Sequence, residues 1–327
     1  MPYKLRDRVR HKFDQKQYNK RDWPTYEGGL CRRGDVEYWI SEDAIEQWRS
    51  EASGKAKRGR PLKYSALAIE TMHVMRLVYQ KPLRFTEGFV KSIFRLMGLD
   101  LPVPDHTTVS RRAQKLEVKR KKIPQDQNIV VLIDSTGLKV VGEREWMNYK
   151  HGTRVRKVWR KLSLGTDEHG EIIAATLTTH TDSDCSQVDP LLRQIDAPIA
   201  EAIADSAYDQ PATYRALEEH QLRHGQDKPI TAIIPPNTGF RKERDTDPAQ
   251  RLANIRVIED KGKHKWQDLT RYGRRAGAEN SMHRYKSLTG GKLRAKHFQS
   301  QEVEVQIVVQ ILNRMASLGM PKSRPST

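Results

Sequence analysis

Residues 128–133, Asn-Ile-Val-Val-Leu-Ile, form the aliphatic run that most constrains the fold of this chain. A short run of β-branched and aliphatic residues is typical of a strand buried on both faces. It is followed at once by Asp134, and a second such run, residues 199–204, is followed by Asp205. We therefore predict an α/β sheet in which two acids stand at the ends of buried strands.

The pattern around these runs predicts further elements. Strands are expected at 158–165, 172–178 and 231–234, with a hairpin turn at 167–170. Helices are expected after Asp184 and Ser186 as caps, at 209–220 with Pro211 in the first turn, from about 274 to 288, and at 305–315. This order predicts a ribonuclease H-like domain, a mixed five-stranded sheet flanked by helices, over residues 124–320. Residues 237–268 are expected to be a loop, a disordered strip or a small insertion in it, and 321–327 a disordered tail.

Before this domain, residues 65–118 show the spacing of three helices. Asp105 is placed to cap the third, whose outer face includes Thr107, Ser110 and Arg111, with Arg112 beside them. Two readings stay open for residues 56–123: a helix-turn-helix-like DNA-binding domain, or an ordinary helical domain with solvated charges. Seven basic residues and one acid between Arg111 and Lys122 favour contact with phosphates. Residues 1–55 are polar with scattered aromatic residues, and their structure is left open apart from a short helix capped by Ser41.

The charge of the chain points to a polyanionic partner. Lys and Arg number 59 against 41 Asp and Glu, a net charge of +18, which suggests nucleic acid or else a solubility device. The Arg58-Gly59-Arg60-Pro61 segment fits either the core of an AT-hook, which enters a narrow minor groove, or a plain basic linker. Two cysteines exclude a zinc site. No secretory signal or apolar run long enough for a membrane span is present, so we expect a cytoplasmic protein near the nucleoid.

One late acid stands out. Glu279 is the only acid between Leu269 and Gln301, among eight cations, so it is either a surface ion pair or a metal ligand beside a polyanion. With Asp134 and Asp205 it would supply the hard oxygen ligands that two Mg²⁺ ions need, with Mn²⁺ as a substitute. Among the other acids, Asp209 suits a helix N-cap, and Asp182 and Asp184 are candidates for caps or for supporting groups near the metals.

The spacing of Tyr272, Arg275, Glu279 and Lys286, Y-(2)-R-(3)-E-(6)-K, resembles the signature of the DDE transposases of bacterial insertion sequences. The segments 134–139, 159–162 and 204–208 resemble insertion sequence family five, and the likeness spans roughly residues 60–315. Ser206 and Ala207 depart from the residues that are commoner in the family between the second Asp and the Tyr.

This resemblance implies an enzyme that cuts the ends of its mobile element and joins them to target DNA. Asp134, Asp205 and Glu279 would be its metal ligands, and Tyr272, Arg275 and Lys286 would contact DNA near the cleaved end. It also implies double-stranded DNA with terminal inverted repeats as a partner, and a homodimer that holds both ends. A DNA-binding regulator without chemistry and a structure-directed nuclease on the same fold are the alternatives.

Overall fold

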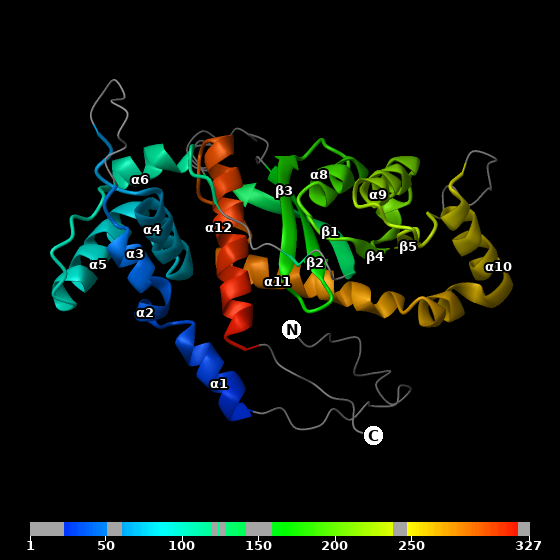
Figure 1. Cartoon of the computed structure of the whole chain (residues 1–327), viewed down its shortest axis with the longest axis horizontal. Coiled ribbons are helices and arrows are strands. Elements are labelled where there is room, and N and C mark those ends of the chain that lie inside the picture. The colour runs from blue at the N-terminus through cyan, green and yellow to red at the C-terminus, as the bar shows by residue number, and fades with distance from the viewer. Residues whose placement is uncertain are drawn as a thin grey trace, which may run out of the picture.

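The computed structural model describes residues 23–50, 61–118, 123–124, 128–141, 159–237 and 247–319. Figure 1 shows a central sheet with helices on both faces, and a separate group of helices on the far side of the long helix α12 (Phe298–Ser317). Within the described residues no helix has the length and apolar character needed to cross a membrane.

The sheet is mixed and has the strand order β3-β2-β1-β4-β5, with β6 also paired to β1. Its strands are β1 (Ile129–Val140), β2 (Trp159–Asp167), β3 (Ile172–Thr179), β4 (Ile199–Ile203), β5 (Thr231–Ile233) and β6 (Lys292–Leu293). β2 runs antiparallel to both β1 and β3, whereas β4 and β6 lie parallel to β1, and β5 parallel to β4. The predicted count of five strands was wrong by one, because β6 has two residues and therefore no periodicity to detect.

The prediction that the first strand ends before Asp134 was also wrong. β1 continues to Val140, because its residues after Asp134 keep pairing with β2 as far as Lys139 opposite Trp159. Asp134 itself lies opposite Leu164. Residues 135–137 are polar or glycine, so their strand character comes from pairing with the neighbouring strand, while Leu138 further along is fully buried in the core.

The alternation of side chains along β1 divides the core into two layers. Val131 and Ile133 pack with residues of α8 (Val188–Leu192) and α9 (Pro211–Arg223) on one face. Val130 and Leu132 pack on the other face, against Trp266 and Ala278. Because strand side chains alternate with a period of two, Asp134 belongs to the second face. That face is covered by α11 (Ala276–Thr289), which crosses below the sheet in Figure 1.

The segment predicted as a loop or insertion is largely helical. α10 (Ala249–Leu269) is broken at Gly262, whose φ of 80° and ψ of 158° lie outside the helical region. The chain then turns back, since Trp266 Nε1 donates to Asn254 Oδ1 at 2.9 Å across twelve positions that a straight helix would separate by about 18 Å. α10 is therefore a bent arm at the β5 end of the sheet (Figure 1).

Amide side chains cover the two edge strands. Asn313 and Gln306 of α12 bond the backbone of Ile172 and Ala175 in β3. At the other edge, Gln250 Oε1 accepts from the amide of Ala232 in β5 at 2.7 Å. Both edges thus have backbone groups bonded by side chains of the same chain, which disfavours pairing with a foreign strand.

The N-terminal helices pack on α12. They are α1 (Trp23–Arg32), α2 (Val36–Trp39) and α3 (Glu42–Glu46), and Ser41 caps α3 as predicted by accepting from Ala44 N at 3.3 Å. Arg33 and Tyr38 donate to backbone oxygens near the end of α12, and Trp39 is buried in the same core. Residues 1–22 and 51–60, with Arg58 and Arg60, lie outside the described residues, as do 320–327.

Three helices follow, as the spacing predicts: α4 (Ala66–Val78), α5 (Leu83–Leu96) and α6 (His106–Ala113). Gly98 has a φ of 69°, and Asp105 caps α6 by accepting from Thr107 N and Thr108 N. The connection between α5 and α6 is longer than the tight turn of a simple helix-turn-helix. The apolar faces of these helices join α12 and the sheet in one core cluster.

Two buried histidines predict how stability depends on pH. Burial lowers the pKa of His73, between α4 and α6, to about 4, and burial also lowers the pKa of His220 in α9. An unfolded chain with ordinary histidines, of pKa about 6.5, binds more protons below that value, so stability must fall as pH drops from about 7 toward 4. We expect His73→Leu to remove about 2 kcal/mol of the loss between pH 7 and pH 5, measured by urea unfolding at each pH. The exposed His180→Leu should leave the pH slope unchanged, and an unchanged slope in His73→Leu would contradict the account.

Candidate active site

The pairing of β1 with β4 brings the two aspartates level. In this parallel pair Leu132 lies opposite Ile203, so two residues further along each chain stand Asp134 and Asp205. Asp205 caps the short turn η3 (Ser206–Tyr208) by accepting from Ala207 N at 2.8 Å. Asp134 accepts from Ser135 N at 2.9 Å. Backbone amides therefore fix both carboxylates at the point where β4 has ended and β1 continues.

The helix that carries Glu279 lies against the same face of β1. A Cβ added at Gly277 would stand 2.6 Å from Leu132 Cδ1, so the absence of a side chain there permits the close approach of α11. Ala278 is buried against β1 and β4, and Glu279 follows it on the first turn of the helix. The third acid thus reaches the side of the sheet on which Asp134 lies.

The charges of these groups influence one another. Burial raises the pKa of Asp134, the Ser135 amide and the Arg275 guanidinium oppose the rise, and the negative charges of Asp205 and Glu279 add to it. Burial likewise raises the pKa of the Tyr272 hydroxyl, opposed by Arg275 and reinforced by the same three acids. The fold therefore gathers five predicted residues, Asp134, Asp205, Tyr272, Arg275 and Glu279, into one electrostatic environment.

Arg275 and Glu279 form an ion pair four residues apart on the helix. The Glu279 side chain is 55 % exposed, so this pair alone would be the surface ion pair that the sequence left as one alternative. The pair differs from an ordinary surface ion pair because the Arg275 guanidinium also opposes the rise in the pKa of Asp134. In this structure Arg275 supplies positive charge to a site that holds three carboxylates.

On the opposite face of β1, the residue after Asp134 is hydrogen-bonded to another element. Ser135 Oγ donates to Asp184 Oδ1 at 2.6 Å, and Lys161 Nζ lies 3.2 Å from the same oxygen. Of the two roles left open for Asp184, the helix cap was wrong, since its carboxylate makes no cap bond to the turn that follows it, whereas its contacts with Ser135 and Lys161 fit a supporting group beside Asp134. The backbone oxygen of Asp182 also accepts a hydrogen bond from Lys161 Nζ, at 2.6 Å. These contacts stiffen the strand segment that presents Asp134.

The three acids do not form a closed cage around a single ion. Among the described residues, no three Asp, Glu, His or Cys side chains surround one point closely enough to hold a metal ion together. A hydrated ion such as Mg²⁺ does not require such a cage, because it commonly takes one or two carboxylates and completes its shell with water and substrate phosphate oxygens. The three carboxylates would meet that requirement if Glu279 turned away from Arg275. The roles of these acids as ligands stay predictions.

The predicted DNA contacts fall in two places. Lys286 is exposed on α11, two turns after Glu279 and on the same side of the helix. Thr107, Ser110 and Arg111 are exposed on α6, in the N-terminal helical group. Arg112 is turned inward, where Nη1 donates to the backbone oxygen of Tyr64, so it is less suited to contact DNA than its neighbours.

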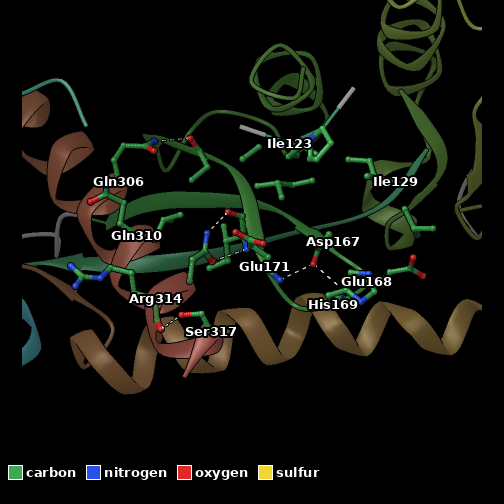
Figure 2. A pocket seen from close by; sticks show the side chains of 18 of the residues that line it. Ile123, Ile129, Asp167, Glu168, His169, Glu171, Gln306, Gln310, Arg314 and Ser317 are labelled. Atoms are coloured by element: carbon green, nitrogen blue, oxygen red, sulfur yellow. Dashed lines mark hydrogen bonds between the residues drawn. The ribbon is translucent and has the colours of Figure 1, made fainter. Parts of the chain in front are cut away.

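A cavity of about 870 Å³ is lined by residues of the β2–β3 hairpin, the start of β1 and α12. Figure 2 shows acidic and amide side chains around it, including Asp167, Glu168 and Gln306. Asp167 accepts from the amides of His169 and Glu171, which confirms the predicted hairpin turn. Gln306 donates to the backbone oxygen of Ala175 in β3. The bonds of these groups stabilise the hairpin and the sheet edge, and Asp134, Asp205 and Glu279 do not line the cavity.

Sequence reasoning missed a buried ion pair beside the site. The prediction that Asp209 caps α9 was wrong, because Asp209 is buried and bonded to Arg251 of α10 at 3.0 Å. Arg251 also bonds Asp247 at 2.6 Å. The available signal was the spacing of Asp247 and Arg251 around Pro248, which marks a helix start with an acid four residues before a base.

Comparison with known proteins matches this chain to one protein family. A family model described as "Transposase DDE domain" matches residues 125–314, more than half of the chain, and a second model of that description matches residues 31–143. Among solved structures, one match is the Drosophila P element transposase strand transfer complex, with 12% sequence identity and a TM-score of 0.28. That match covers 72% of this chain and 48% of the other, so the chain spans about half the length of that protein.

A mixed sheet that brings two aspartates and a glutamate to one face defines a candidate site for metal-dependent chemistry on DNA. By the extent of the family match, the chain belongs to the transposase DDE domain family. The predicted membership of a DDE transposase family is confirmed.

Proposed function

We propose that this chain is the transposase of a bacterial insertion sequence of family five. It binds the terminal inverted repeats of its element, cleaves DNA strands at the element ends, and joins the 3′ ends to target DNA. The observation that carries the proposal is the placement of Asp134 of β1, Asp205 in the turn after β4 and Glu279 of α11 on one side of the sheet, through the β1–β4 register and the close approach of α11 at Gly277. The spacing of Tyr272, Arg275, Glu279 and Lys286 supports the assignment to the family.

The fold that goes with this proposal is ribonuclease H-like. The strand order β3-β2-β1-β4-β5, with an antiparallel first half and parallel β4 and β5, supports it. Asp134 on β1, Asp205 just after the adjacent strand β4, and Glu279 on the helix α11 would be the metal ligands. Two Mg²⁺ ions, or Mn²⁺ in their place, would activate the attacking water or 3′-hydroxyl and stabilise the leaving oxygen.

The protein groups around the acids handle the DNA. Arg275 releases Glu279 when metal binds and turns its guanidinium to a phosphate near the cleaved end, where its planar fork suits two oxygens. Tyr272 packs beside it, with its ring 5.3 Å from that of Trp266. Lys286 contacts the backbone further along the strand. The exposed face of α6, with Thr107, Ser110 and Arg111, reads the terminal repeats, and Arg58 and Arg60 add minor-groove contacts.

The assembly we propose is a homodimer that holds both element ends, acting on chromosomal DNA in the bacterial cytoplasm. Incubation with Mg²⁺ and DNA duplexes that carry matched element ends tests the function. Cleavage followed by joining supports the transposase. Binding without cleavage would identify a regulator, and cleavage without joining would identify a structure-directed nuclease on the same fold; either outcome overturns the proposal.

A further inference from the structure

The buried carboxylate of Asp209 is the centre of a charged network next to the second acid. Its oxygens accept from Arg251 Nε at 3.1 and 3.0 Å, from the Tyr214 hydroxyl at 3.0 Å and from the Asn237 amide at 2.9 Å. Arg251 Nη1 also donates to Asp247 Oδ2 at 2.6 Å. The side chains of Asp209 and Arg251 are 0 % and 4 % exposed, so both charges are withdrawn from water.

A buried ion pair of this kind contributes little to the stability of a fold. Moving two charges out of water carries a large penalty, and well-packed apolar residues of similar volume often serve a fold equally well or better. What a buried, multiply bonded pair does provide is a fixed geometry, because each bond has a preferred direction and length. The place of this pair in the fold shows which parts it fixes.

Asp209 stands at the end of the turn that holds Asp205. The amide of Tyr208 donates to the Asp205 backbone oxygen at 3.1 Å, and the amide of Asp209 donates to the Ser206 backbone oxygen at 3.3 Å. The Asp205 carboxylate caps this same turn. Any movement of Asp209 is therefore transmitted through a few backbone bonds to the carboxylate at position 205.

Arg251 stands at the start of the arm that leads to Glu279. One turn later, Asn254 accepts from Trp266 Nε1, and the Trp266 ring packs on Tyr272. Tyr272 begins the short helix η5 (Tyr272–Arg275), which runs directly into α11. The Asp209–Arg251 pair thus joins the turn of the second acid to the arm that ends at the third acid.

We propose that Arg251 is a positioning residue for the metal site. Through Asp209 it fixes the distance between Asp205 and the segment of Tyr272, Arg275 and Glu279, and so fixes the geometry in which the ions bind. The inference rests on the proposed function and deepens it. Groups that orient metal ligands typically change metal affinity by about 10- to 100-fold when they are removed.

The test uses a neutral double variant, Asp209→Asn with Arg251→Met, in the full-length chain. Asparagine keeps an acceptor for the Asn237 amide and turns its NH₂ toward the Tyr214 hydroxyl, which can accept. Methionine fills the arginine stem, so neither charge of the Asp209–Arg251 pair is left buried without the other, while Asp247 loses its bond to Arg251. The matched control carries the same two substitutions on the exposed pair Asp189 and Arg193, whose side chains are 35 % and 62 % exposed. Arg251→Lys, which keeps the charge but loses the planar fork, is a milder second variant.

The readouts are Mn²⁺ affinity by titration calorimetry, the thermal unfolding midpoint, and affinity for element-end DNA without metal. For the double variant we expect an unfolding midpoint within a few degrees of the parent, unchanged DNA affinity, and Mn²⁺ binding weakened by about tenfold or more. Raised Mn²⁺ should restore its cleavage. If the double variant does not fold, Arg251→Lys decides, with an expected loss of about threefold in Mn²⁺ affinity.

Unchanged Mn²⁺ affinity in the folded variant, or an equal loss in the Asp189 and Arg193 control, would overturn the inference. Failure of the proposed function has a different signature: Asp134→Asn would then bind Mn²⁺ as the parent does, showing that the metal site is not among these acids. A parent that loses Mn²⁺ through Asp134→Asn but not through the double variant would refute only the role of Arg251.

Discussion

Replacement of Asp134 by Asn is expected to lower the rate of strand cleavage by at least about 10³-fold while leaving affinity for element ends nearly unchanged. The carboxylate is the central acid of the site, and it feels both Asp205 and Glu279. An amide of the same size supplies one weaker, uncharged oxygen, so the ions that bear the developing charge in the transition state are lost, and such stabilisation is worth several kcal/mol. Single-turnover cleavage of labelled duplexes in Mg²⁺ measures the rate, and a gel-shift titration measures binding.

Asp196→Asn is the matched control, because Asp196 is an exposed aspartate in the same domain, away from the acids. It should cleave as the parent does. Asp205→Asn and Glu279→Gln should reproduce the loss seen for Asp134→Asn. Normal cleavage by any of these three would remove that residue from the metal site, and normal cleavage by all three would refute the site altogether.

A fourfold rise in salt is expected to lower DNA affinity on the order of 10⁴-fold, if about eight phosphates are neutralised. The physical cause is the release of condensed counterions, one set for each contact between a cation and a phosphate. Fluorescence anisotropy titrations between 50 and 200 mM salt, in the absence of metal, give the slope. A nearly flat response would show that the charge of +18 does not serve DNA binding.

Replacing single basic residues shows which of them contribute to the salt dependence of DNA affinity. Lys286→Gln should reduce its magnitude by about one unit and weaken binding to all sequences alike. Lys228→Gln makes the same charge change before β5, at the opposite end of the parallel strands from the acids, and should leave the slope unchanged. Equal slopes for the two variants would contradict the placement of DNA along α11.

The local elements of this fold are readable in the sequence because each has its own physical signal. The aliphatic run before Asp134, the turn at 167–170 and the Gly290 that ends α11 with a φ of 68° are determined by burial, turn chemistry and glycine conformation. The family resemblance and the order of the acids led to the transposase that the family match supports. Their meeting on one face depends on strand order, which periodicity alone does not contain.

The features that escaped prediction depend on tertiary partners. β1 continues past Asp134 because β2 pairs with it. α10 turns back at Gly262, and the turn is stabilised by the hydrogen bond that Trp266 donates to Asn254. Aspartate is a residue type that commonly caps helices. The carboxylates of Asp184 and Asp209 instead form ion pairs with Lys161 and Arg251, which belong to other elements. A short acidic side chain can serve a cap or an ion pair equally well, and only the neighbours that the fold supplies decide between them.

The central claim is that Asp134, Asp205 and Glu279 together hold two ions, and anomalous scattering from crystals grown with Mn²⁺ and element-end DNA tests it most directly. The account predicts two Mn²⁺ peaks about 4 Å apart, bridged by Asp134, with Asp205 and Glu279 each bound to one and the Arg275–Glu279 ion pair opened. Mn²⁺ bound elsewhere, or an absence of peaks at these acids while Glu279 stays paired with Arg275, would contradict it.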